Sequence, residues 1–304
     1  MKLEDSWNIL ANEVQFEEIF FVSDIEIFTK EIKKYLLERI KQDKIKLVVF
    51  AGDILSFLEK DVGPLKIYDD SYSAFKLFYD TDQFLKDNKL EESDLFNASK
   101  YVVGEKISEL IVKDHKDELD HFFSFVKTCK RKKVEIIFFS GNHDSMLSYN
   151  NYFFDADYIP IFKKIKKLSN FHIPYDLQLI ELNENLFLLG IHTNFNTDRC
   201  SEYPELERLT NSLEEIEGAK EIIFVSHVPG VSKFSKLGSK DITNFKKRFK
   251  FKYHFHGHCK NYHGEYVEEG IPTKSVHFDH PELEDEETSS KSPDNPYQST
   301  LMLF

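Results

Sequence analysis

The sequence predicts an α/β fold built on buried strands. Short apolar runs rich in β-branched and aromatic residues are each bounded by Gly or Ser, which is typical of buried strands. Apolar residues with helical spacing follow the first of these runs. A predicted turn joins two further apolar runs within residues 177–191. The five clearest runs cover residues 19–22, 47–50, 136–139, 222–225 and 251–255.

The first two runs flank a predicted helix, so the chain is expected to open as strand, helix, strand. The apolar positions with helical spacing are Phe28, Ile32, Tyr35, Leu36 and Ile40. The same spacing predicts a further helix around residues 119–126. Residues 177–191 predict a hairpin that turns at 183–185, and residues 299–304 predict a closing strand.

The chain of 304 residues, 41% of them hydrophobic, predicts a single domain over residues 1–304. The loops at Asp53 and Asn142 are separated by far more residues than one crossover helix needs. We therefore expect a mostly helical insertion at about 59–115, and an acidic loop rich in Ser and Pro at about 281–298. A lid, a surface for a protein partner and a plain structural embellishment all remain open for the insertion.

Composition limits the cellular context. No apolar run approaches the ~20 residues that cross a bilayer, so no membrane role is predicted. The three cysteines are scattered and odd in number, which favours a reducing compartment and a cytoplasmic protein.

Charge limits the partners. A formal net charge of −13 argues against nonspecific nucleic-acid binding. Two local stretches are nevertheless basic, at residues 163–167 and 246–252. The first is expected to be a solvated face. The second, with its interleaved aromatic residues, leaves contact with a phosphorylated substrate or a nucleic acid open, although nucleic acid is not favoured.

Each predicted strand leads into a loop that carries a side chain able to bind a metal. Ligands of α/β sheets gather outside the carboxyl ends of the strands, so these strand ends are expected to bring the side chains together. The loops are Ser23-Asp24-Ile25-Glu26, Gly52-Asp53, Gly141-Asn142-His143-Asp144, Ser226-His227 and Gly257-His258.

Taken in order, these loops resemble the motifs of the calcineurin-like metallophosphoesterase superfamily. The resemblance spans nearly the whole chain, and the ordered set is specific where a single Gly-Asn-His-Asp is not. It implies a two-sheet α/β sandwich flanked by helices, a four-layer αββα arrangement, with a two-metal site at the strand ends. It also implies hydrolysis of phosphomonoesters or phosphodiesters by a metal-bound hydroxide.

The resemblance also implies a role for each ligand. Asp53 takes the position that bridges two metals, and Asn142, His227 and His258 complete the protein ligands of the second metal. This mixture of carboxylate, amide oxygen and imidazole suits Mn²⁺, Fe or Zn²⁺.

Two further residues of the Gly-Asn-His-Asp loop are implied to act in catalysis. His143 matches the histidine that meets the phosphoryl oxygens or the leaving group, and Asp144 matches its orienting partner. Substrate phosphate is expected to meet Asn142, His143 and Lys260.

The first metal site departs from the family pattern in two places. Where the family has Asp-x-His the chain has Asp24-Ile25-Glu26, and where it has Gly-His-x-His the chain has Gly257-His258-Cys259-Lys260. A protonated Lys has no acceptor and is not a metal ligand. One hypothesis is a one-metal variant in which the Lys260 ammonium replaces the first cation beside Asp24 and Glu26. The other is that Asp24, Glu26 and Asp53 bind a weak first ion, with Lys260 turned outward or toward substrate phosphate.

The other histidines receive weaker interpretations. His254 and His256 are expected to be hydrogen-bonded surface residues, and His192 is a candidate for supporting the site from another strand end. No ligand spacing assigns a role to His115, His121, His172, His263, His277 and His280.

The sequence therefore predicts a metal-dependent phosphatase or phosphodiesterase that uses one or two divalent transition-metal ions. The alternatives are a catalytically weak or inactive scaffold that binds a protein through the insertion, and a nuclease subunit. Retention of His143, Asp144 and the ligands of the second metal speaks against a pure scaffold. The natural substrate is not indicated, because specificity in such folds lies in the loops.

Overall fold

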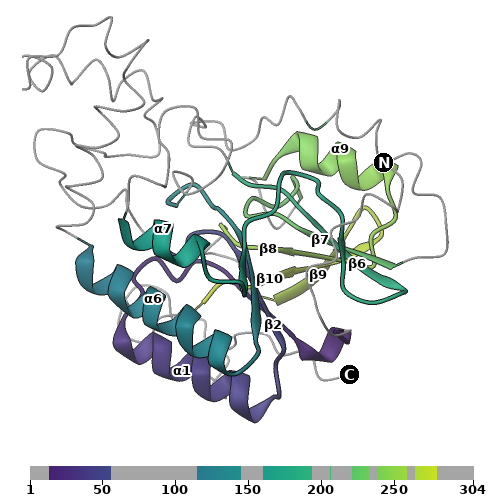
Figure 1. Ribbon diagram of the computed structural model, residues 1–304. Helices are drawn as coiled ribbons and strands as arrows, with labels where there is room; N and C mark the ends of the chain where they lie inside the picture. Colours follow the sequence, from purple (N-terminus) through teal and green to yellow (C-terminus); the bar gives the residue numbers. More distant parts are fainter. Residues whose placement is uncertain are drawn as a thin grey trace, which may run out of the picture.

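Two sheets with helices on their outer faces form the part of the chain that the structure describes (Figure 1). The computed structural model describes residues 14–55, 115–144, 160–193, 206, 221–232, 238–258 and 264–278. The predicted closing strand, the acidic loop and all of the predicted insertion except His115 lie outside these residues.

The first sheet has four parallel strands in the order β1-β2-β3-β4. They are β1 (Ile19–Val22), β2 (Leu47–Ala51), β3 (Glu135–Phe139) and β4 (Phe171–His172). The first three strands confirm three of the predicted apolar runs, and nearly all of their residues are buried. Because the strands are parallel, their carboxyl ends lie along one edge of the sheet.

The second sheet has six strands in the order β5-β6-β7-β8-β10-β9. They are β5 (Ile180–Glu181), β6 (Leu186–Gly190), β7 (Glu221–Val225), β8 (Tyr253–His256), β9 (Gly264–Glu268) and β10 (Ile271–Ser275). β6, β7, β8 and β10 are parallel, whereas β5 and β9 pair antiparallel with their neighbours. The antiparallel pair of β5 and β6 confirms the predicted hairpin.

Alternation along the strands divides the core into layers. In β1, Phe20 and Val22 pack in the cluster beneath the helices, whereas Ile19 and Phe21 pack between the two sheets. Successive side chains of a strand point to opposite faces, so a run that is apolar throughout supplies both layers. This confirms the two-sheet arrangement that the family resemblance implies.

Helices cover both outer faces (Figure 1). Against the first sheet lie α1 (Lys30–Gln42), α6 (Lys116–Arg131) and α7 (Pro160–Lys166), and against the second lies α9 (Lys240–Arg248). A short 3-10 helix, η2 (Phe16–Glu18), precedes β1. None of the described helices is long and apolar enough to cross a membrane.

Helices α1 and α7 account for the first predicted apolar stripe and for the first basic stretch. Thr29 caps α1 by accepting a hydrogen bond from the Ile32 N–H (3.3 Å), which places the predicted apolar stripe against the sheet. α7 carries most of the first basic stretch. Its Phe162 and Ile165 are fully buried while Lys163 and Lys164 are exposed, so this stretch is the solvated face that we expected.

The hairpin of β9 and β10 was not predicted. Its two-residue turn, Glu269-Gly270, has φ values of 52° and 78°, as a type I′ turn requires. Asn-Gly or Asp-Gly would have signalled this turn, whereas Glu-Gly does not. The hairpin matters for the site, because the chain that leaves β10 bridges to the end of β1 through Ser23 and His277.

The ends of α1 and α6 use lysines in a conformation that favours glycine. Lys44 and Lys133 have φ values of 55° and 59°. The next residue closes each helix, since the Ile45 N–H donates to Ile40 O and the Val134 N–H donates to Cys129 O, both at 3.0 Å.

We expect Lys133→Gly to raise the free energy of unfolding by about 0.5–1 kcal/mol, because glycine adopts positive φ without a Cβ clash. Lys132→Gly is the matched control. Lys132 has φ −90°, so the same change there adds only chain entropy to the unfolded state and should destabilise the protein. Urea unfolding of both variants measures the difference. Equal destabilisation by the two changes would contradict the interpretation.

Candidate metal centre

The predicted ligand loops lie at the carboxyl ends of the strands, and the structure brings these ends together. Asp24, Asp53 and Asn142 follow β1, β2 and β3 of the first sheet, and His227 and His258 follow β7 and β8 of the second. Hydrogen bonds cross between the sheets here, since His227 Nδ1 lies 3.0 Å from Ala51 O and the His258 N–H donates to both Asp24 oxygens at 3.1 Å.

Four donor atoms converge on one point. His227 Nε2 lies 2.9 Å from Asp53 Oδ2 and 3.0 Å from Asn142 Oδ1, and His258 Nδ1 lies 3.1 Å from the same Asn142 oxygen. Ligands at right angles around one ion, with bonds of ~2.1 Å, are separated by ~3 Å. The spacing and the mixture of oxygen and imidazole donors therefore fit a divalent transition-metal ion.

The orientation of His227 is set by the backbone. A carbonyl oxygen only accepts hydrogen bonds, so the contact with Ala51 O requires a proton on Nδ1. Nε2 is thereby the nitrogen that faces Asp53 and Asn142. Metal-binding imidazoles are commonly held in this way through the nitrogen that does not touch the metal.

The backbone at the site is in an uncommon conformation. Asp24, Glu26, Asp53 and His258 have φ values of 56°, 59°, 54° and 66°. Residues other than glycine seldom adopt this left-handed region, and they gather there at functional sites. Hydrogen bonds from the Asp24 N–H to Gly52 O (3.0 Å) and from the Glu26 N–H to Asp53 O (2.9 Å) hold the loops in place.

Two glycines allow the loops to approach one another. A Cβ at Gly141 would overlap Asp53 Oδ1, and a Cβ at Gly257 would overlap both Ser23 Oγ and Asp24 Oδ2. The Gly-Asn and Gly-His pairs of the sequence therefore have a packing reason, because each glycine leaves room for a neighbouring ligand loop.

Burial and charge act in opposite directions on the two histidines. Burial lowers the pKa of His227, but the charge and hydrogen bond of Asp53 outweigh it and raise that pKa to about 9. Burial and the neighbouring His227 lower the pKa of His258 to about 4, so His258 is neutral near pH 7. Burial also raises the pKa of Asp53, but the charges of His227 and His143 bring it below its usual value.

The motifs and their arrangement agree with a comparison against protein families. The model of the calcineurin-like phosphoesterases matches residues 18–259, which is most of the chain. This chain belongs to the calcineurin-like phosphoesterase family. The family binds divalent metals, and Asp53, His227 and His258 each place one ligand atom within 4.8 Å of the others.

Comparison with solved structures adds the fold. One crystal structure superposes with a TM-score of 0.54 at 11% identity and covers 85% of this chain and 90% of that chain, a likeness that shows the fold alone. TT1561 of Thermus thermophilus (TM-score 0.48, 8% identity) and a dimetal phosphatase from Danio rerio (TM-score 0.47, 9% identity) cover 85% of this chain. The superposition covers 88% of TT1561 and 86% of the Danio rerio phosphatase. No curated protein matches the sequence.

Asp144 holds the Gly-Asn-His-Asp loop, which also carries His143. The Asp144 carboxylate is fully buried and accepts hydrogen bonds from the Ile54 N–H (2.7 Å) and the Gly141 N–H. Burial and the charge of Asp53 raise the pKa of Asp144 to about 7. Through these two bonds Asp144 holds the backbone of the loop that carries His143, and its role as the orienting partner of the His143 imidazole stays a prediction.

His143 lies beside the donor group through Asp53. Its backbone N–H donates to Asp53 Oδ1 (2.9 Å), and its Nε2 lies 3.8 Å from Asp53 Oδ2. The side chain is 14% exposed, so it lies at the solvent side of a buried carboxylate.

Asp24, a candidate ligand of the first metal, is surrounded by protein donors. Besides the His258 N–H, its carboxylate accepts from Ser23 Oγ (2.6 Å), and His277 Nδ1 lies 3.4 Å away. Burial raises the pKa of Asp24, but the hydrogen bond to His277 and the charge of His227 hold it well below its usual range. Glu26 is also buried, with 7% of its surface exposed.

Lys260 lies outside the described residues. Among the described residues, only Asp53, His227 and His258 form a metal-binding group of three acidic, His or Cys residues.

Three histidines differ from the sequence interpretation. His277 contacts Asp24 although no role was predicted for it, because it follows a hairpin that the sequence did not indicate. His254 and His256 are fully buried rather than at the surface. Burial lowers the pKa of His256 to about 3, and its Nε2 lies 2.9 Å from Tyr266 Oη.

His192 supports the Gly-Asn-His-Asp loop, as a residue from another strand end was expected to do. Its Nε2 lies 2.8 Å from Pro174 O, which places a proton on Nε2 and leaves Nδ1 to accept. Nδ1 accepts the Ser140 N–H (2.9 Å) just before the loop begins. His192 therefore ties the end of β3 to the end of β6.

Lys252, the last residue of the second basic stretch, lies away from the strand ends that form the site. The Lys252 N–H donates to Ile222 O (2.8 Å), and Lys252 Nζ pairs with Glu221 (2.6 Å). These residues begin β7 and β8, whereas His227 and His258 follow the ends of the same strands. Lys252 therefore lies at the opposite end of β8 from His258, and contact between this stretch and a phosphorylated substrate stays a hypothesis.

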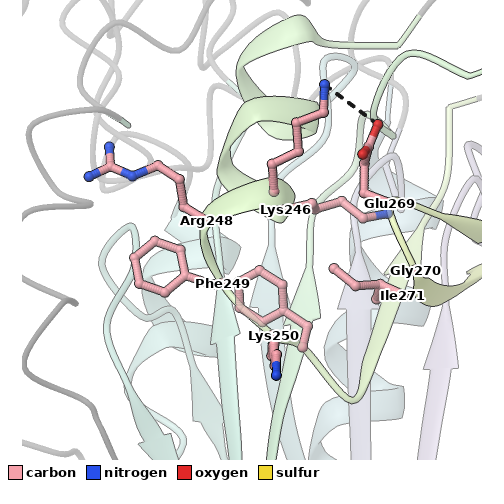
Figure 2. A pocket seen from close by; sticks show the side chains of 9 residues that line it. Lys246, Arg248, Phe249, Lys250, Glu269, Gly270 and Ile271 are labelled. Carbon is pink, nitrogen blue, oxygen red and sulfur yellow. Dashed lines mark ion pairs between the residues drawn. The ribbon is translucent and has the colours of Figure 1, made fainter.

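A pocket lies beside this basic stretch, lined by residues 246–251 and 269–271 (Figure 2). Lys247 pairs with Glu269 (Nζ to Oε1, 3.6 Å), the ion pair drawn as a dashed line in Figure 2. Arg248 and Lys250 point in different directions. These two cations therefore do not converge on one point of the pocket.

Metal binding should release about one proton per ion at mildly alkaline pH. His227 keeps its proton up to a pKa of about 9 in the metal-free protein, and a metal needs the lone pair on Nε2. His258 and Asp53 are already deprotonated, so the apparent affinity should rise about tenfold per pH unit between about pH 7.5 and 8.5. Calorimetric titration with Mn²⁺ in buffers of different ionisation enthalpy measures the released protons. Release near zero would show that Nε2 is not a ligand.

Proposed function

We propose that this calcineurin-like phosphoesterase hydrolyses phosphoesters with one firmly bound divalent ion. The observation that carries the proposal is the convergence of Asp53 Oδ2, Asn142 Oδ1 and imidazole nitrogens of His227 and His258 on one point. The donor types favour Mn²⁺, Fe or Zn²⁺. When bound, such an ion lowers the pKa of a water and polarises a phosphoryl oxygen.

The side chains around the ion have complementary roles in this proposal. The Asn142 amide and the His143 imidazole contact substrate phosphate oxygens, and His143 stabilises the transferring group or protonates the leaving oxygen. The position of His143 supports this role, because its side chain is partly exposed beside the buried Asp53. Asp144 contributes by holding the loop.

The one-metal form rests on two observations. The sequence has Glu26 and Lys260 where the family resemblance implies histidines. Asp24 accepts hydrogen bonds from the His258 N–H and from Ser23 Oγ, so this carboxylate supports the loop of another ligand. We propose that the Lys260 ammonium compensates the charge of Asp24 and Glu26 in place of the first ion. A weakly bound first ion on Asp24, Glu26 and Asp53 is the alternative.

We also propose that the chain forms a single domain and that the protein is cytoplasmic. The helical insertion at about 59–115 is proposed as the surface for a protein partner. The substrate is a phosphate monoester or diester, and nucleic acid is not favoured, because the net charge is −13. A catalytically inactive scaffold is the outcome to adopt if no ester is hydrolysed with any metal.

His143→Ala should lower turnover about 10²–10³-fold while leaving the metal content unchanged, because it removes a catalytic group and no ligand. His258→Ala should lose both metal and turnover. The assay is hydrolysis of aryl phosphate monoesters and diesters with Mn²⁺, with metal content measured on the same samples. His121→Ala on α6 is the control and should match the wild type. Loss of metal in His143→Ala would mean that this residue has been misplaced.

The double variant Glu26→His with Lys260→His should raise the number of bound ions from one per chain to two. Imidazoles at both positions supply the ligands that the family pattern implies, and the change removes the competing ammonium. Metal analysis after equilibrium dialysis against Mn²⁺ counts the ions. Two ions at normal ligand distances in a wild-type crystal grown with Mn²⁺ would overturn the one-metal form.

A further inference from the structure

A buried lysine lies beneath α9, on the outer face of the second sheet. The side chain of Lys246 is fully buried, although this residue begins a basic run in the sequence. Its Nζ contacts three acceptors: His254 Nδ1 at 3.0 Å, Glu268 Oε2 at 3.0 Å and Thr273 Oγ1 at 2.8 Å. An ammonium has three N–H donors, so the contacts use all of them. Burying a charge is costly without such partners.

The protons of this network have only one arrangement. Ser226 Oγ lies 2.6 Å from Val228 O, and a carbonyl only accepts, so the serine hydroxyl donates to it. Ser226 Oγ must then accept from His254 Nε2, which lies 2.8 Å away. His254 Nδ1 is left without a proton and accepts from Lys246. Burial and the charge of Lys246 lower the pKa of His254 well below its usual value, which agrees with a neutral ring.

The network ends at the two residues that flank His227 in the sequence, Ser226 and Val228. Ser226 precedes His227 and Val228 follows it, so the hydrogen bond from Ser226 to Val228 O closes the turn that carries the imidazole. On the opposite side, His227 Nδ1 donates to Ala51 O of the first sheet. The turn is therefore held from α9 and the ring is held from β2.

We infer that Lys246 is a positioning residue for His227, acting through His254 and Ser226 to hold Nε2 where a divalent ion takes it up. The inference rests on the proposed function only in taking His227 as a metal ligand. The network pins the turn before any metal arrives, so less freedom is lost when the ion binds. Removing groups that orient a metal ligand commonly weakens metal affinity by ~10–100-fold.

The test is a titration with Co²⁺, whose visible absorption reports both affinity and ligand geometry. We expect Lys246→Met and Ser226→Ala each to weaken Co²⁺ binding by ~10-fold and to alter the visible band. Lys247→Met is the matched control. Lys247 is the next residue of the same helix, is 54% exposed and pairs with Glu269 at the surface, so its affinity should equal that of the wild type.

A double variant separates positioning from general destabilisation. If Lys246 acts through Ser226, Lys246→Met combined with Ser226→Ala should bind Co²⁺ about as weakly as the worse single variant, since both changes break one path. Independent losses would multiply to ~100-fold and overturn the inference.

Affinity and stability are measured together. Single variants that unfold more easily in urea yet bind Co²⁺ within twofold of the wild type would show a purely structural network and overturn the inference. Ser226→Ala decides the matter if Lys246→Met does not fold, because it removes one oxygen from a loop. A wild-type chain that binds Co²⁺ but hydrolyses no ester leaves the inference standing and removes only the proposed activity. A wild-type chain that binds no Co²⁺ overturns both.

Discussion

The hydrogen bond from His227 Nδ1 to Ala51 O joins the two sheets at the point where their ligand loops meet. His227 follows β7 of one sheet, and Ala51 ends β2 of the other. This contact ties one sheet to the other at the site, fixes the tautomer of the imidazole and points Nε2 at Asp53. The other donors depend on the alignment of the sheets, because Asp53 and Asn142 come from the first sheet and His258 from the second. Any relative slip of the sheets would separate oxygen donors from nitrogen donors.

Much of this arrangement could be predicted from local patterns. Asp53, Asn142, His227 and His258 each follow an apolar run, and the parallel geometry of such runs brings their ends to a common edge. The strand-end rule predicted that the loops meet, and the family resemblance implied which of their side chains bind the metal. His277 escaped notice for the opposite reason. It reaches Asp24 from the end of β10, and β10 enters the sheet through a hairpin whose Glu-Gly turn carries a weak signal.

The basic stretch shows a different limit of sequence reasoning. Alternation along β8 puts Phe255 on one face and His254 and His256 on the other, but alternation does not say what covers each face. Here α9 covers the polar face, and its amphipathic pattern includes Lys246 on the buried side. A lysine followed by further cations is usually solvated, so only the packed structure could show that this one contacts Glu268 and His254. The charge run therefore predicted the exposed lysines of α7 but not the buried Lys246 of α9.

The left-handed backbone at Asp24, Glu26, Asp53 and His258 also bears on how such a site changes over evolutionary time. Asn, Asp and His enter this region of φ more readily than most residues, whereas β-branched side chains are almost excluded from it. Random substitution at these positions is therefore filtered by backbone shape before any selection for chemistry acts. Glycine, Asn, Asp and His pass this filter most readily, and three of these four carry a side chain that can bind a metal.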